Sequence, residues 1–269
     1  MRRVDRPGSG SYAPAVLLAI DVGNTNTVVG AFEGRTLRHP WRLQTNQHRT
    51  ADEYGILLRQ MFELSGLDPA KVTAVAISNV VPPLALTLEK MAVRYFNVKP
   101  MFVGPGVKTG MPILYENPRE VGADRVVNAV AAYERWRQAL IVVDFGTATT
   151  FDAISAKGEY LGGAIAPGIT ISMDALARAA SKLPRVEFAK PPVVIGRNTV
   201  ASIQAGLVYG YVGLVDGICG RMAEELGVTP HVVATGGLAP LIAGVSRSIQ
   251  DVDEHLTLEG LRILHERNR

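Results

Sequence analysis

The strongest constraint in this sequence is one motif that occurs twice, about half a chain apart. An apolar stretch at residues 16–20 runs into DVGNTNT at 21–27, and a second apolar stretch at 141–143 runs into DFGTATT at 144–150. An offset of 123 residues aligns Asp21 with Asp144, Gly23 with Gly146 and Thr27 with Thr150. A repeat of this length predicts two copies of a domain rather than a solenoid.

Around both motifs the hydrophobic spacing predicts alternating strands and helices. Each copy opens with the order strand, turn, strand, turn, strand, which favours an α/β fold with an N-terminal half at 15–137 and a C-terminal half at 138–269. Residues 1–14 are interpreted as a flexible leader. The expected strands are 16–20, 28–32, 36–43, 72–77, 101–103, 141–143, 151–154, 160–165 and 232–234; the expected helices are 54–64, 84–96, 123–137, 169–180, 199–226, one after 235–237, and 258–267.

Composition narrows the class of protein. The 269 residues are 47% hydrophobic and 20% charged, which is typical of a globular protein. A formal net charge of +3 is too small to indicate a nucleic-acid or membrane partner. The single cysteine, Cys219, excludes an intrachain disulfide and a multi-cysteine zinc site, so we expect a reducing, cytoplasmic compartment. The apolar run 13–20 is too short to span a membrane.

Both Asp-Xaa-Gly turns carry groups that suit a polyphosphate. Gly23 lets backbone N–H groups approach an anion closely, and Thr147 adds a hydroxyl donor in the second copy. Asp21 and Asp144 would repel phosphate unless a cation lay between them, which makes Asp21 a candidate Mg²⁺ ligand. The alternative for each turn is an Asx-turn in a tight hairpin that binds nothing. Because ligands of open α/β sheets lie beyond the carboxyl ends of strands, the two turns could hold a polyphosphate from both sides.

A third cluster is GADR at residues 122–125, where a helix is expected to begin. Asp124 could simply cap that helix, and Arg125 could form a surface ion pair. The preceding loop 104–118 is rich in Gly and Pro and carries Tyr115, which favours a binding loop beside this helix start.

Two other segments have a structural and a functional interpretation. Thr235-Gly236-Gly237 is either a nucleotide contact or a common strand-to-helix turn. In GRNT at 196–199, Asn198 or Thr199 is expected to cap the following helix. The five histidines show no metal-binding spacing, and both tryptophans are expected to pack rather than to stack on a ligand.

Taken together, six segments resemble the type III pantothenate kinases, which belong with acetate and sugar kinases, actin and the heat-shock ATPases. In chain order they are LLAIDVGNTNTVVGAF, VGADRVVNAVAA, VVDFGTATTFD, GGAIAPGI, IGRNT and ATGGL. The combination of GADR with both turns is specific, and the resemblance runs from about residue 17 to the C-terminus. It implies duplicated ribonuclease H-like (actin-like ATPase) halves with a nucleotide cleft between them. It also implies ATP-dependent phosphorylation of pantothenate to 4'-phosphopantothenate, the first step of coenzyme A biosynthesis.

The resemblance further implies roles for individual residues. Asp124 matches the proton acceptor, Asp144 the site of a monovalent cation (K⁺ or NH₄⁺), and Arg125 suits the pantothenate carboxylate. Thr199 matches a position that reaches into the site of the partner in a homodimer. The ATP and phosphate positions are Asp21, Val22, Gly23, Asn24, Thr25, Asn26, Thr27, Val28 and Thr147, to which the glycine turn adds Gly236 and Gly237; the pantothenate positions are Tyr115, Gly122, Ala123, Asp124, Arg125 and Thr199.

Two alternative functions remain at this point. One is another phosphotransferase or a phosphatase of the same superfamily, which GADR and the tyrosine-bearing loop disfavour. The other is a non-enzymatic regulatory or accessory relative, which the presence of Asp21, Asp124 and Asp144 disfavours.

A homodimer is expected because the helix 199–226 has more apolar surface than one core needs, although a fully internal helix would explain the same pattern.

Overall fold

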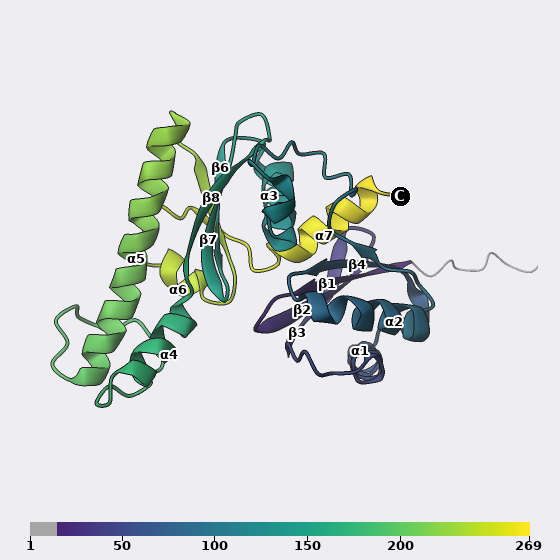
Figure 1. Ribbon diagram of the computed structural model, residues 1–269, viewed down its shortest axis with the longest axis horizontal. Coiled ribbons are helices and arrows are strands. Elements are labelled where there is room, and N and C mark those ends of the chain that lie inside the picture. Colours follow the sequence, from purple (N-terminus) through teal and green to yellow (C-terminus); the bar gives the residue numbers. More distant parts are fainter. Residues whose placement is uncertain (1–14) are drawn as a thin grey trace, which may run out of the picture.

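Two five-stranded sheets with the same topology form the framework of the protein (Figure 1). The computed structural model describes residues 15–269, so the predicted leader at 1–14 lies outside the described residues. Strand order is β3-β2-β1-β4-β5 in the first sheet and β8-β7-β6-β9-β10 in the second. In both, three antiparallel strands are followed by two parallel ones. The expected duplicated, actin-like α/β fold is therefore confirmed.

The elements lie close to their predicted positions. The strands are β1 (Val16–Val22), β2 (Asn26–Glu33), β3 (Thr36–Gln44), β4 (Val72–Asn79), β5 (Met101–Phe102), β6 (Leu140–Phe145), β7 (Ala148–Ile154), β8 (Tyr160–Pro167), β9 (His231–Thr235) and β10 (Asp251–Val252). The helices are α1 (Ala51–Leu64), α2 (Ala85–Phe96), α3 (Ala123–Trp136), α4 (Ile169–Ala179), α5 (Thr199–Leu226), α6 (Ala239–Ala243) and α7 (Leu256–Arg267). The Asn198 side chain caps α5 by accepting a hydrogen bond from the backbone N–H of Ala201 at 2.8 Å, as one of the two expected caps.

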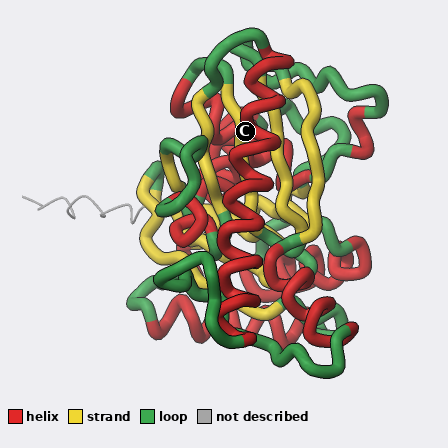
Figure 2. Tube along the Cα trace, turned by 90° about the vertical axis from the view of Figure 1, so that its left-hand side faces the viewer, coloured by secondary structure: helices red, strands yellow, loops and turns green. Residues whose placement is uncertain are grey.

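Alternation along the central strands divides the molecule into five layers. In β1, Leu17 faces the space between the sheets, whereas Leu18 faces the opposite side, and in β6 Val142 and Val143 do the same. Helices α1 and α2 therefore cover the outer face of the first sheet, and α3 and α7 fill the space between the sheets. Helices α4, α5 and α6 cover the outer face of the second sheet, with α5 in the foreground of Figure 2.

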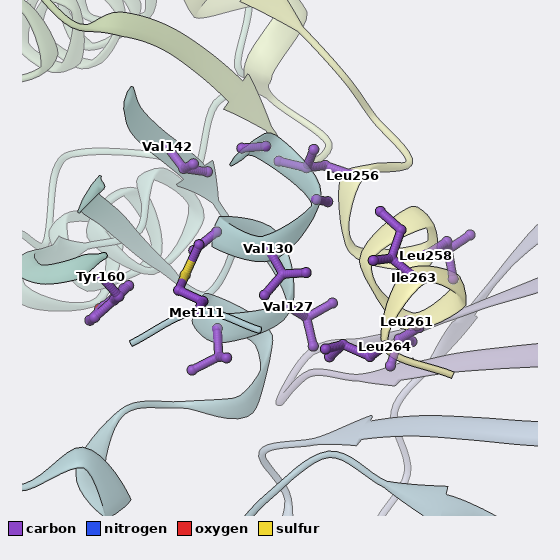
Figure 3. Packing of buried hydrophobic residues seen from close by; sticks show 14 of the residues in the cluster. Met111, Val127, Val130, Val142, Tyr160, Leu256, Leu258, Leu261, Ile263 and Leu264 are labelled. Carbon is purple, nitrogen blue, oxygen red and sulfur yellow. The ribbon is translucent and has the colours of Figure 1, made fainter. Parts of the chain in front are cut away.

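The central layer joins the two sheets. Val127 and Val130 of α3 pack with Leu261 and Leu264 of α7 (Figure 3). The two helices approach closely because Gly260 has no side chain: a Cβ there would collide with the carbonyl oxygen of Val127. Helix α7 also packs against β1, β2 and β4, so the end of the chain returns to the first sheet. The division of the chain at residue 137 stays a prediction.

Within the described residues, α5 is the one helix long and apolar enough to cross a membrane by length and composition. Its buried residues, among them Val208 and Val215, pack on the second sheet, together with Ile141 and Val143 of β6. The apolar composition of α5 therefore belongs in part to the core of the C-terminal half.

The structure corrects the alignment of the two motifs by one residue after the glycine. Val22 pairs with Thr27 in the first copy, whereas Phe145 pairs with Thr149 in the second. The second turn is thus one residue shorter, and Thr27 corresponds to Thr149 rather than to Thr150. The sequence alignment was wrong here because it allowed no gap in the turn. Both structurally equivalent threonines are buried.

Candidate active site

The two Asp-Xaa-Gly turns meet between the sheets. The hydroxyl oxygens of Thr25 and Thr147 lie 2.7 Å apart, within hydrogen-bond distance. Each turn is closed in the same way, because the backbone N–H of its glycine donates to a carbonyl oxygen at 3.0 Å, from Gly23 to Asn26 and from Gly146 to Ala148. The duplication therefore brings two equivalent loops to one place, as the polyphosphate interpretation requires.

Two carboxyl groups lie directly before these turns, and both are largely withdrawn from water. Burial and the neighbouring Asp124 raise the pKa of Asp21 from 3.8 to about 8. Burial, Asp124 and Asp152 raise the pKa of Asp144 from 3.8 to about 7. Their mutual repulsion shows that carboxyl groups predicted from separate segments lie close together.

Each of these two carboxyl groups has a distinct surrounding. The Oδ1 atom of Asp21 is buried and has no hydrogen-bond partner among the described residues. The Oδ2 atom of Asp144 accepts a hydrogen bond from the Asn128 side chain at 3.1 Å, and Asn128 in turn accepts one from the Thr257 hydroxyl at 2.7 Å. Asp144 is thus held in one orientation, whereas Oδ1 of Asp21 has no such partner, although the nearby Ser78 hydroxyl lowers the pKa of that carboxyl group.

The glycine turn after β9 lies against the second motif. Gly236 adopts φ +94°, and a Cβ there would lie 2.6 Å from the Phe145 carbonyl oxygen and 2.9 Å from Oδ1 of Asp144. Gly237 faces Arg42 of β3, whose charge lowers the pKa of Asp144. Glycine at 236 is therefore required for this turn to lie beside the carboxyl group, beyond its role as a strand-to-helix connection.

GADR forms the start of α3, as predicted. The cap position is Gly122, and Asp124 lies two residues further on, where its Oδ1 accepts the backbone N–H of Arg125 at 2.8 Å. The simple helix-cap interpretation of Asp124 is therefore wrong. Burial raises the pKa of Asp124, and its charge reaches both Asp21 and Asp144.

Arg125 forms an ion pair, but not at the surface. Its Nε donates to Oδ1 of Asp152 at 2.8 Å and its Nη2 lies 2.6 Å from the same oxygen, with Asp152 fully buried. The Tyr160 hydroxyl donates to that oxygen at 2.7 Å. Tyr115 lies beside Tyr160, with ring centroids 6.4 Å apart. The predicted pantothenate residues Tyr115 and Arg125 are thus brought together.

Sequence reasoning missed Asp152 and Tyr160. An acidic residue inside the apolar strand segment FDAI was the available signal, because a buried carboxylate needs a partner. Thr199 is not brought to the other predicted substrate residues: it is exposed at the first turn of α5, on the outer face of the second sheet. The role predicted for Thr199 involves a partner subunit, so it stays a prediction.

Among residues 15–269, no group of three or more His, Cys, Asp or Glu side chains forms a ready-made metal cage. The individual carboxyl groups nevertheless fit cations. An unpartnered buried oxygen on Asp21 and the raised pKa values of Asp21 and Asp144 are both features that a bound cation would relieve.

Comparison with known proteins agrees with this arrangement. A family model described as "Type III pantothenate kinase" matches residues 17–221. The type III pantothenate kinase of Anaeromyxobacter sp. (strain K) is 80% identical over 254 residues, covering 94% of this chain and 100% of its own. That of Myxococcus xanthus (strain DK1622) is 71% identical over 253 residues, covering 94% and 99%.

Among solved structures, the ethanolamine utilization protein EutJ from Carboxydothermus hydrogenoformans superposes with a TM-score of 0.56 at 15% identity. The match covers 95% of this chain and 91% of that one, which shows a shared fold. The chain belongs to the type III pantothenate kinase family, and it is an ATP-dependent kinase that phosphorylates pantothenate in coenzyme A biosynthesis.

Proposed function

We propose that pantothenate is phosphorylated where the two turns meet the start of α3. The observation that carries this placement is the contact of Thr25 with Thr147 at 2.7 Å, beside the mutually repelling carboxyl groups of Asp21, Asp124 and Asp144. Phosphoryl transfer has a loose transition state, so positioning and charge neutralisation supply most of the catalysis. The cleft offers fixed groups for both.

The two turns bind the phosphates of ATP. Their exposed residues, including Asn24 and Thr25 in the first and Gly146 in the second, present backbone N–H groups and hydroxyls toward the cleft. Thr147 contributes from the second turn, and Gly236 with Gly237, which lie against that turn, contact the nucleotide through their backbone. The remaining members of the first phosphate loop are Val22, Gly23, Asn26, Thr27 and Val28.

Asp124 acts as the proton acceptor for the pantothenate hydroxyl. Its Oδ1 is held by the Arg125 backbone N–H, which leaves Oδ2 to accept the hydroxyl proton. Burial raises the pKa of Asp124 and so makes its carboxylate a stronger base than an exposed one. In a loose transition state the proton moves late, so orienting the hydroxyl is as much its task as accepting the proton.

Asp21 holds Mg²⁺, directly or through water, and Asp144 holds a monovalent cation. The unpartnered oxygen of Asp21 and the fixed carboxyl of Asp144 are the chain's contributions. When bound, such ions neutralise phosphate charge and allow both carboxyl groups to ionise beside a polyanion.

The protein works as a cytoplasmic homodimer in which Thr199 completes the partner's pantothenate site. Exposed apolar residues immediately before α5 support this, with 61% of Val194 and 84% of Ile195 accessible in the single chain. The two actin-like halves are 15–137 and 138–269, with the site between them.

One assay tests the proposal. A coupled assay contains ATP, Mg²⁺ and pantothenate, and is run in K⁺, in NH₄⁺ and in Na⁺ alone. We expect phosphorylation that needs Mg²⁺ and is fastest with K⁺ or NH₄⁺, and we expect Asp144→Asn to remove the difference between the cations. Equal rates in Na⁺ and K⁺ would rule out the monovalent site, and a wild-type dependence that persists in Asp144→Asn would place it elsewhere.

A further inference from the structure

The two edges of the Arg125 guanidinium differ: the side edge contacts Asp152, and the terminal edge, which includes Nη1, has no acceptor of its own among the described residues. Its side edge, Nε and Nη2, faces Oδ1 of Asp152. Nη2 is buried, yet it makes no hydrogen bond of acceptable geometry, and among the described residues no hydrogen bond reaches Nη1. The residue is only 8% exposed, so these donors have little access to water. A guanidinium whose Nη1 has no acceptor within the described residues, and whose Nη2 meets only the oxygen already bound by Nε, suits an anionic ligand.

Asp152 is itself held from a second direction. Its Oδ1 accepts the Tyr160 hydroxyl at 2.7 Å, and both Asp152 and Tyr160 are fully buried. The Tyr160 ring also lies under the guanidinium, 6.0 Å from its Cζ to the ring centroid. On β8, a Cβ at Gly163 would lie 1.7 Å from the Phe151 carbonyl oxygen and 2.9 Å from Nη2, so only glycine lets the strand pass this close to β7 and the guanidinium. Contacts from β7 and β8 thus leave Arg125 with one orientation.

We propose that Asp152 and Tyr160 are positioning residues that fix the side edge of Arg125, so that its terminal edge selects acceptors bearing a carboxylate. The proposal rests on the proposed function, which places pantothenate at the start of α3, where Arg125 follows Asp124. Pantothenate carries its carboxylate at the end opposite the reacting hydroxyl, so this contact would set both affinity and distance to Asp124. Lysine at 125 could serve only one of the two partners, because it has no second edge.

Pantothenyl alcohol provides the decisive comparison, because a CH₂OH group replaces the carboxylate while the reacting hydroxyl is retained. For Asp152→Asn we expect kcat/KM for pantothenate to fall about 10–100-fold, the loss typical of a misaligned hydrogen bond to a charged group. This fall should come mainly from a higher KM for pantothenate, with the KM for ATP unchanged. For pantothenyl alcohol, kcat/KM should stay within about twofold of wild type, so the preference for the acid disappears.

The chain contains a matched control on its surface. On the first half, Oδ1 of Asp52 accepts Arg94 at 2.6 Å and the Tyr95 hydroxyl at 2.8 Å, which is the same Arg–Asp–Tyr arrangement away from the cleft. Asp52→Asn and Tyr95→Phe should leave the ratio of the two substrates unchanged. A change in that ratio would mean that loss of such a triad acts through general stability, which would overturn the proposal.

Each outcome decides between specific roles. Equal losses for both substrates in Asp152→Asn, or no loss for pantothenate, would reduce Asp152 to a structural residue and overturn the proposal. If Asp152→Asn does not fold, Tyr160→Phe, which removes a single donor, decides by the same ratio. Arg125→Lys tests the placement of the carboxylate separately from the positioning role of Asp152 and Tyr160. A wild-type preference for the acid in this variant would overturn the placement of the carboxylate at Arg125. Loss of preference in Arg125→Lys but not in Asp152→Asn or Tyr160→Phe would overturn the positioning role alone.

Discussion

The hydroxyls of Thr25 and Thr147 lie 2.7 Å apart, although 122 residues separate them in the chain. Both lie inside the equivalent turns, Thr25 between Gly23 and Asn26 and Thr147 between Gly146 and Ala148. The contact therefore lies where the internal repeat meets itself. In the function proposed above, a phosphate held by both turns would replace this single contact with a hydrogen bond from each hydroxyl, so that a duplicated domain would form one site.

Thr147→Ala should raise the KM for ATP by about 10–100-fold, because in the proposed function it removes a hydroxyl that donates to a charged phosphate. Thr147→Ser keeps the hydroxyl and should stay within about threefold of wild type. Initial rates at varied ATP and saturating pantothenate measure both variants. An unchanged KM for ATP in Thr147→Ala would exclude a phosphate contact from this residue.

Asp124→Asn should lower kcat by roughly 10²–10⁴-fold, the usual effect of removing a general base, while ATP still binds. The amide keeps the shape of the side chain and can still accept the Arg125 N–H that now reaches Oδ1. Calorimetric titration with a non-hydrolysable ATP analogue provides the binding control. The expected residual kcat lies far below a tenth of the wild-type value. A variant that retains more than about a tenth would mean that another group accepts the proton.

The raised pKa values of Asp21, about 8, and Asp144, about 7, predict a pH-dependent stability when no cation is bound. Both groups hold protons more tightly in the folded than in the unfolded chain. Their contribution is therefore complete below the unfolded pKa near 3.8 and is lost as the pH rises through about 7 and about 8. We expect the urea midpoint without Mg²⁺ and K⁺ to fall as the pH rises from about 4 to about 8, and to level off above that range.

Asp21→Asn tests the origin of that slope, because the amide does not titrate. Its urea midpoint should change less with pH than that of the wild type, and added Mg²⁺ should stabilise the wild type most at high pH. The same slope in both proteins would assign the effect to other groups.

Gly236→Ala should abolish most activity because φ +94° is strained for alanine and its Cβ would collide with the Phe145 carbonyl oxygen, 2.6 Å away, and with Oδ1 of Asp144, 2.9 Å away. Gly106→Ala is the matched control, since Gly106 has φ +95° with nothing within 4 Å of the added Cβ. Both variants carry the strain of about 1 kcal/mol or more, but only the first disturbs the cleft. Thermal unfolding and kcat measured side by side separate strain from site damage.

How far the sequence predicts this molecule depends on the range of each interaction. The strands and long helices follow from local apolar spacing, and so do the turns with Asp21 and Asp144. Strand β10 does not, because two residues beginning with an acidic Asp251 carry no periodicity and pair only through β9. The sequence predicts helix α7, but it does not predict that this helix packs against the first sheet, because that packing depends on contacts between distant segments.

The same limit holds in the site. Asp124 and Arg125 could be predicted because they form one contiguous motif, whereas their surroundings could not. Asp152 meets Arg125 across 27 residues and Thr25 meets Thr147 across 122, and no local pattern encodes either contact. The mistaken one-residue alignment of Thr27 has the same cause, since only strand register reveals a shortened turn.

Subunit complementation tests whether Thr199 serves a neighbouring site. Within one chain it lies exposed at the start of α5, next to Ile195, 84% of which is accessible. In an isologous dimer, the two copies of this surface would face each other. We expect Thr199→Ala and Asp124→Asn subunits, each nearly inactive alone, to regain activity when mixed and allowed to exchange. A mixed dimer has one pocket with both defects and one with neither, so activity should return to as much as half of the wild-type value per mixed dimer. With sites confined to single chains, every pocket keeps a defect and nothing returns. Subunit exchange is verified with differently tagged chains; absent recovery after exchange, or a monomer by light scattering at assay concentration, would refute the shared site.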